Sequence, residues 1–189
     1  MFSCFGKEFL WGECDFPYDL LVSLDCGDEK RLGENERYLK GNIINIDHHV
    51  SNTRFGSLNY IDHKAAATGE IICELTEFLN IPYTKEMATA LYGAILTDTG
   101  GFMFSNTTCK THNHAAKLIE AGADYYNLNK KLIQEKDYKR QYITAKCIEN
   151  MEFFFDGKLC LSVFDHEYCK SLDMTDEDLN GLAQVPRTV

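Results

Sequence analysis

The chain has 189 residues, enough for one sizeable domain or one domain with a small addition. Apolar residues make up 44% and charged residues 25%, which is typical of a folded globular protein and not of a disordered or collagen-like chain. The 29 acidic residues outnumber the 19 basic ones and give a net charge of −10, which argues against a protein that coats long duplex DNA.

The cysteines and the start of the chain indicate a reducing compartment. The eight cysteines form no CxxC pair and are too sparse for a disulfide scaffold. The chain opens without the basic and apolar regions of a signal peptide, and no apolar run approaches the ~18 residues of a membrane span. We therefore expect a soluble, cytoplasmic protein with reduced thiols and no membrane partner.

Two short apolar runs near the start predict buried strands. They are 19–25 and 42–47, and the acids that close them are Asp25 and Asp47. The polar stretch 28–40 between them fits a short crossover helix, which would make a βαβ unit with two parallel strands. Because ligands of open parallel sheets bind beyond the carboxyl ends of the strands, both acids fall where a site is expected.

Helical spacing follows these strands. Apolar residues recur at that spacing from 65 to 79, and a second helix is predicted after Thr84 that ends near Asp98, where Gly100 and Gly101 break it. Further helices are predicted over 110–121, 125–135 and 137–152.

The pattern changes after Asn150. The runs 153–155 and 158–163 predict a hairpin, and a short helix near 174–179 leads to Pro186. We expect an α/β fold in which βαβ units with flanking helices are followed by the start of a small α+β domain. The expected divisions are a main domain at 1–125, a helical connector at 126–150 and the second domain at 151–189.

The tripeptide Asp47-His48-His49, at the end of the second strand, is the most informative motif. Taken alone, two adjacent histidines are more often polar residues of a surface loop. Asp25 and Asp98 change that balance, because carboxylate oxygens and imidazole nitrogens together form a site for a divalent metal ion. Manganese suits this mixture of ligands better than calcium does.

The sequence around these residues resembles the DHH phosphoesterase family over nearly the whole chain. The closest resemblance is to its DHH/DHHA1 branch, the nanoRNase-type oligoribonucleases that also remove the 3′-phosphate of phosphoadenosine phosphate. The resemblance rests on the segments Val22–Asp28, Asn45–Thr53, Ala90–Phe102 and Ser105–Thr108. Shorter segments, such as Ala67-Thr68-Gly69-Glu70, agree with the same branch.

The resemblance implies a two-metal site that uses Mn²⁺, with Mg²⁺ or Co²⁺ as alternatives. Asp25 would bridge the two ions, and His48 and Asp98 would be further ligands of one of them. His49 would face the substrate phosphate as a catalytic residue, and Asp47 would orient the histidines. The residues expected to bind substrate are Asn52, Arg54, Ser105 and Asn106. Turn chemistry explains Ser105 and Asn106 equally well, and a solvated arginine is the commoner outcome for Arg54.

The chain departs from the family at both ends. The family's first motif, a His-x-Asp-x-Asp turn that supplies most ligands of the other metal, has no counterpart before Asp25. Likewise, the glycine-rich motif of the DHHA1 domain has no counterpart after Ala183. We therefore expect an incomplete chain that retains one metal site and has little or no activity.

The predicted function is manganese-dependent hydrolysis of short oligoribonucleotides, of the 3′-phosphate of phosphoadenosine phosphate, or of both. Cyclic-dinucleotide phosphodiesterase and polyphosphatase or pyrophosphatase activities are alternatives within the superfamily. Outside enzymes, the alternative is a non-catalytic metal-binding or interaction remnant. Such a remnant could form a homodimer through an exposed sheet edge.

Overall fold

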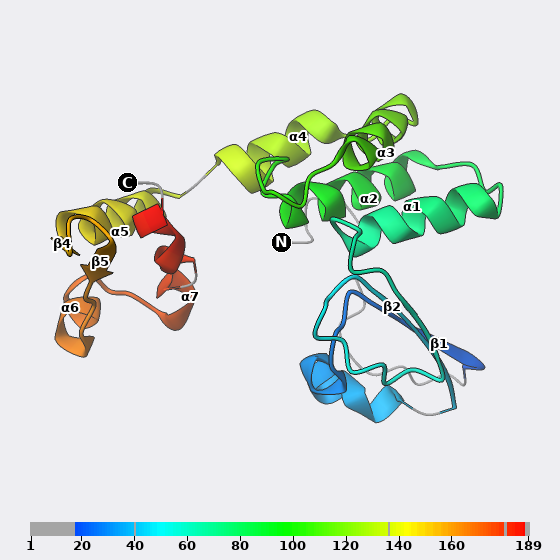
Figure 1. The fold of residues 1–189 in the computed structure, drawn as a ribbon, viewed down its shortest axis with the longest axis horizontal. Helices are drawn as coiled ribbons and strands as arrows, with labels where there is room; N and C mark the ends of the chain where they lie inside the picture. Colours follow the sequence, from blue (N-terminus) through cyan, green and yellow to red (C-terminus); the bar gives the residue numbers. More distant parts are fainter. Residues whose placement is uncertain (1–17, 40, 136, 180, 188–189) are drawn as a thin grey trace. The chain divides into compact units, whose positions relative to one another are not determined.

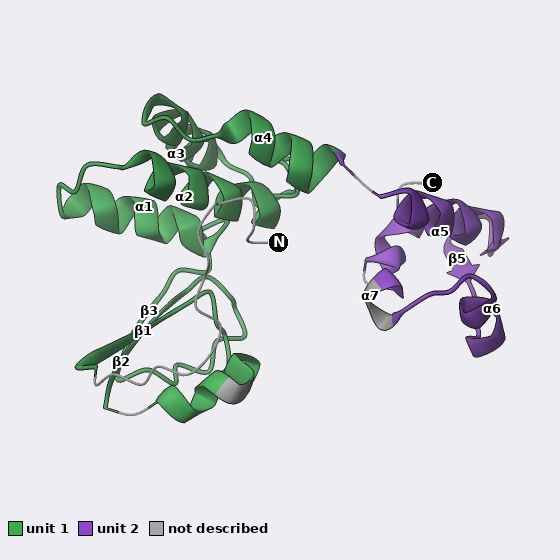
Figure 2. Ribbon diagram, turned by 180° about the vertical axis from the view of Figure 1, so that it is seen from behind, with its two compact units in different colours: residues 1–134 green, residues 135–189 purple. Residues whose placement is uncertain are grey.

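The computed structural model describes residues 18–39, 41–135, 137–179 and 181–187, and the chain forms two compact units (Figure 1, Figure 2). The first unit is Met1–Gln134 and the second is Glu135–Val189. The predicted connector at 126–150 is divided between these units, because the helix after residue 137 belongs to the second one.

A three-stranded parallel sheet of the order β1-β2-β3 begins the first unit. Its strands are β1 (Leu20–Leu24), β2 (Asn42–Asp47) and β3 (Leu58–Ile61). The α/β class, the first two strands and their parallel pairing are confirmed. The sequence did not predict β3, because four residues are too few to show a clear alternation.

The crossover between β1 and β2 is a 3₁₀ helix, η2 (Glu29–Tyr38), and not an α-helix. The side chain of Asp28 caps it by accepting a hydrogen bond from the N–H of Lys30. Gly33 has φ 56° and kinks the helix in the middle. The predicted crossover therefore exists, in a tighter and interrupted form.

The helical layer of the first unit consists of α1 (Thr68–Phe78), α2 (Lys85–Asp98), α3 (Cys109–Glu120), α4 (Tyr125–Asn129) and the π-helical turn η3 (Lys130–Gln134). Figure 1 shows α1 and α2 running side by side. As predicted, α2 begins after Thr84, whose side chain accepts from the N–H of Met87. In contrast, α1 begins three residues later than predicted, because Ala67 still has an extended backbone.

The core of the first unit lies among these helices. Its largest fully buried apolar side chains are Ile95, Leu96 and Leu118, each 0% exposed. They come from α2 and α3, and Cys73 of α1 is buried with them. The apolar side chains of α2 pack into this core, and the last residue of the helix, Asp98, lies near His48, which follows β2.

The second unit contains α5 (Tyr138–Glu149), the antiparallel pair β4 (Met151–Phe154) and β5 (Leu159–Ser162), α6 (His166–Ser171), α7 (Asp176–Leu179) and the 3₁₀ helix η4 (Leu182–Arg187). The hairpin is confirmed, with Phe153 opposite Cys160. Ile143, Cys147 and Leu182 form a small separate core. Because α6 is only six residues long, its periodicity did not reveal it.

Six cysteines lie in the described part of the chain, and all of them are free thiols: Cys26, Cys73, Cys109, Cys147, Cys160 and Cys169. Among the helices of that part, none is long and apolar enough to cross a membrane.

Candidate metal centre

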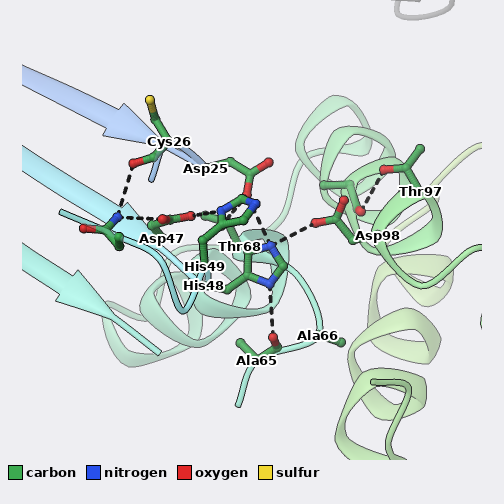
Figure 3. A network of polar contacts seen from close by, with 12 residues as sticks. Asp25, Cys26, Asp47, His48, His49, Ala65, Ala66, Thr68, Thr97 and Asp98 are labelled. Atoms are coloured by element: carbon green, nitrogen blue, oxygen red, sulfur yellow. Dashed lines mark hydrogen bonds and ion pairs between the residues drawn. The ribbon is translucent and has the colours of Figure 1, made fainter. Parts of the chain in front are cut away.

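The three predicted metal ligands come together from three elements of the first unit (Figure 3). Asp25 directly follows β1, His48 directly follows β2, and Asp98 is the last residue of α2. Parallel strands end at the same edge of a sheet, which brings Asp25 and His48 together. The end of α2 then brings Asp98 close to Nε2 of His48, the same ring nitrogen that faces Asp25.

The spacing of these side chains suits a metal ion. His48 Nε2 lies 3.5 Å from Asp25 Oδ1 and 3.6 Å from Asp98 Oδ2. Two ligand atoms that each lie about 2.1 Å from one cation are themselves roughly 3.0–3.5 Å apart. Two carboxylates and an imidazole are also a donor set that divalent first-row metals accept. The donor chemistry therefore fits a divalent metal ion, with Asp25 and Asp98 each close to His48 Nε2. The three side chains whose ligand atoms all lie within 4.8 Å of one another are Asp25, His48 and His49, a group that does not include Asp98.

The ring of His48 is held in the tautomer that a metal ligand needs. Its Nδ1 lies 3.2 Å from the carbonyl oxygen of Ala65. A carbonyl can only accept a hydrogen bond, so Nδ1 carries a proton, and Nε2, which faces Asp25 and Asp98, is the ring nitrogen that would bind a metal ion. His48 is thus oriented by a backbone group.

Asp47 orients His49, whereas the carbonyl of Ala65 orients His48. Its carboxylate is fully buried and accepts from His49 Nδ1 at 2.7 Å and from Asn52 Nδ2 at 2.6 Å. Burial alone would raise the pKa of Asp47, but the hydrogen bonds from Asn52, His49 and the backbone of His48 outweigh it and keep the pKa below its usual 3.8. Asp47 therefore stays ionised and fixes the ring of His49.

His49, and not Asp98, forms a group of potential metal ligands with Asp25 and His48. One ligand atom each from Asp25, His48 and His49 lie within 4.8 Å of one another. No other group of this kind occurs among the residues that the structure describes. The expected loss of the family's first motif concerns residues 1–17, which lie outside the described residues.

The charge distribution favours a cation at this place. Burial raises the pKa of Asp98, and the negative charge of Asp25 raises it further, while His48 and His49 lower it only in part. Two carboxylates that repel each other in this way would be stabilised by a divalent cation between them.

The position of Asp25 depends on Thr68, a residue that the sequence alone did not indicate as part of the site. The backbone of Asp25 has φ 57°, which is uncommon for a residue other than glycine. Thr68 Oγ1 donates a hydrogen bond of 2.8 Å to Asp25 Oδ1, and the N–H of Asp25 donates to the carbonyl of Ile46. The only available signal was the position of Thr68 within a segment shared with the family.

The four predicted substrate-binding residues lie in two loops near these ligands. Asn52 Nδ2 donates to Asp47 and also to Asn45 Oδ1, a buried side chain that was not predicted to matter. Asn106 Nδ2 donates to the carbonyl oxygens of Ala66 and Asp98. Both amide nitrogens are therefore engaged within the protein. Arg54 and Ser105 have exposed side chains.

A solved structure shares this fold. The crystal structure of an exopolyphosphatase-related protein from Bacteroides fragilis superposes with a TM-score of 0.82 at 23% sequence identity. The match covers 90% of this chain and 52% of that one.

Two curated relatives are similar in sequence. The chain is 30% identical over 173 residues to the probable bifunctional oligoribonuclease and PAP phosphatase NrnA of Streptococcus mutans, covering 91% of this chain and 55% of the relative. It is 35% identical over 144 residues to the bifunctional oligoribonuclease and PAP phosphatase NrnA of Thermus thermophilus, covering 76% of this chain and 43% of the relative. The chain thus spans about half the length of the curated relatives it matches.

A family comparison agrees with the site. Residues 6–95 match the family described as DHH family, N-terminal domain. This range includes Asp25 and the tripeptide Asp47-His48-His49, and the match confirms the resemblance to the DHH family that the sequence shows.

Proposed function

We propose that this chain holds the metal-binding site of a manganese-dependent phosphoesterase. Its substrates would be short oligoribonucleotides, the 3′-phosphate of phosphoadenosine phosphate, or both. The main support is that two carboxylates converge on His48. Asp25 Oδ1 lies 3.5 Å and Asp98 Oδ2 lies 3.6 Å from His48 Nε2. The substrate class is supported by the names of the two curated relatives.

Asp25, His48 and Asp98 would hold the metal. A divalent cation at this place supplies positive charge that offsets the charge of the phosphate oxygens, and it lowers the pKa of water in the site. The protein's own contribution is to hold two of the ligands in place, through Thr68 on Asp25 and Ala65 on His48. A chain of net charge −10 could bind a polyanion in this way, because a bound metal would offset the negative charge of the carboxylates that hold it.

His49 would act on the substrate directly. Its Nδ1–H donates to the ionised Asp47, so its Nε2 is the atom that can bind or release a proton. A protonated His49 would donate Nε2–H to a phosphate oxygen, and the charge of Asp47 would stabilise that imidazolium. Arg54 and Ser105 would contact the phosphate or ribose, and Asn52 and Asn106 would support them.

The test combines metal binding with hydrolysis. We expect isothermal titration to show one Mn²⁺ site in the wild-type chain and none in Asp25→Ala. We expect weak turnover of a dinucleotide and of phosphoadenosine phosphate, reduced at least about 100-fold in Asp25→Ala if the carboxylate holds the metal. Asp19→Ala, which removes an exposed carboxylate just before β1, is the matched control and should behave as wild type.

Two results would contradict the proposal. One is a wild-type chain that does not bind Mn²⁺, and the other is turnover that Asp25→Ala leaves unchanged. Cyclic dinucleotides and pyrophosphate in the same assay test the alternative substrates, since faster hydrolysis of either would replace the proposed substrate class.

A further inference from the structure

Three buried alanines lie at the centre of the framework that holds the metal ligands. Ala65, Ala66 and Ala67, here called the alanine segment, are 5%, 1% and 0% exposed. The carbonyl oxygen of Ala65 accepts from His48 Nδ1 at 3.2 Å, and the N–H of Ala66 donates to Glu70 Oε2 at 3.1 Å. The orientation of this segment therefore determines the orientation of the His48 ring.

Asn106 connects the alanine segment to the element that provides Asp98. Its side-chain nitrogen Nδ2 lies 3.1 Å from the carbonyl oxygen of Ala66 and 3.1 Å from that of Asp98. An amide nitrogen carries two hydrogens, so it can make both bonds at once. The last carbonyls of an α-helix have no partner within the helix, and Asn106 supplies one at the end of α2.

The loop between Asp98 and Asn106 is built to return to the helix end. Gly100, Gly101 and Phe102 have φ values of 57°, 73° and 66°, which turn the chain sharply after α2. Asn106 follows this turn and reaches both carbonyls. One side chain thus joins the backbone segment that orients His48 to the backbone that carries Asp98.

We propose that Asn106 is a positioning residue that sets the separation of His48 and Asp98 for a divalent cation. The inference rests on the proposed metal site, but it concerns a contact that exists without the metal. Removing the Asn106 donor should let the two ligands move apart, because His48 Nε2 and Asp98 Oδ2 are held 3.6 Å apart by elements that Asn106 links. Metal affinity should then fall, while the rest of the fold is retained.

The first test uses the metal-free chain. In Asn106→Asp, a carboxylate of the same shape replaces the donor and faces two carbonyl oxygens. Hydrogen–deuterium exchange should become faster both in the alanine segment with the start of α1 and in the last turn of α2. Asn127→Ala, which removes an exposed asparagine whose side chain donates to Asp124, is the matched control and should change neither segment.

The second test measures Mn²⁺ affinity by titration. Asn106→Asp and Asn106→Ala should each weaken binding about 10-fold, the usual cost of losing a group that supports a metal ligand. In the Asp98→Ala background, the same substitutions should cost clearly less, because one of the two ligands whose separation Asn106 sets is gone. Asn106→Ala adds no charge and provides the test if Asn106→Asp is unfolded by circular dichroism.

The outcomes separate this inference from the proposed function. Faster exchange in only one of the two segments, or in neither, would overturn the inference. So would equal losses of affinity with and without Asp98, because a residue that merely supports the fold gives additive effects. A wild-type chain that binds no Mn²⁺ would contradict the proposed function, whereas the exchange result would still show whether Asn106 joins the two segments.

Discussion

Thr68 and Asp25 are joined by a 2.8 Å hydrogen bond between the first residue of α1 and the residue that follows β1. The hydroxyl of Thr68 donates to Asp25 Oδ1, the same oxygen that lies 3.5 Å from His48 Nε2. The left-handed backbone of Asp25 costs about 1–3 kcal/mol and persists only where neighbours hold it. Thr68 therefore helps to fix the carboxylate of a proposed metal ligand, whose backbone N–H donates to the carbonyl of Ile46.

Replacing Thr68 with valine should weaken Mn²⁺ binding about 10- to 100-fold, because valine has the same shape but cannot donate to Asp25. Isothermal titration measures the change. Thr68→Ser keeps the hydroxyl and is the control, with an affinity expected close to that of wild type. If valine and serine weakened binding equally, packing around Thr68 and not its hydrogen bond would be responsible.

Ionised Asp47 should stabilise the folded protein at a pH above 3.8, the usual pKa of an aspartate, and this contribution should be lost in acid. The pKa of Asp47 is lower in the folded protein than its usual 3.8, so the folded state holds the ionised form more strongly than the unfolded state does. The difference in free energy of unfolding between wild type and Asp47→Asn should be roughly 1.5–3 kcal/mol at pH 7. It should shrink as the pH falls below 3.8 and through the lowered pKa.

Urea unfolding of the metal-free protein between pH 7 and pH 2.5 measures this difference. Asp19→Asn, which neutralises an exposed carboxylate, should show no comparable pH dependence. A difference between wild type and Asp47→Asn that grew on acidification would contradict the lowered pKa.

The convergence of the ligands could be predicted from the sequence, because it depends on patterns that local sequence contains. Asp25 and His48 follow apolar runs that read as parallel strands, and Asp98 comes just before two glycines that end a helix. These signals determine the sheet edge at which the acids and histidines meet.

The framework behind those ligands could not be predicted in the same way. The group that orients His48 is the carbonyl oxygen of Ala65, and a backbone group has no sequence signal. Asn45 and Thr68 become important only through partners that are 7 and 43 residues away. Asn106 is predicted to bind substrate, and the sequence does not show that its nitrogen donates to two backbone carbonyls, because these contacts depend on the tertiary structure.

Cys73 should be far less reactive than Cys109 towards thiol reagents. Burial raises the pKa of the Cys73 thiol to about 11, and the charges of Glu77 and Glu70 act in the same direction. At pH 7.5 only about 0.03% of such a thiol is ionised. Mass spectrometry after treatment with iodoacetamide should find Cys109, which is exposed, alkylated and Cys73 unmodified.

The same reaction in urea provides the control for Cys73. Unfolding removes the burial, so both thiols should then react at similar rates. Rapid alkylation of Cys73 in the folded protein would show that the helical core opens more readily than the 0% exposure of Cys73 implies.

Gly100 should be the least replaceable glycine of the loop that leads to Asn106. Its φ is 57°, and a Cβ atom there would collide with the ring of Phe104. Gly100→Ala should therefore destabilise the first unit by more than the ~1 kcal/mol that a left-handed alanine costs. Gly122→Ala is the matched control, because Gly122 also has a positive φ, 94°, but its nearest contact would be an ordinary 3.9 Å to Lys85.

The two contributions at Gly100 can be separated with a second substitution. In the Gly100→Ala background, Phe104→Ala removes the ring that the new Cβ would meet, so it should restore part of the lost stability and Mn²⁺ affinity. In the wild-type protein, which has no Cβ at position 100, Phe104→Ala relieves no collision. Thermal unfolding and Mn²⁺ titration of the four proteins measure the coupling. Purely additive effects would mean that backbone conformation alone, and not the contact with Phe104, requires glycine at this position.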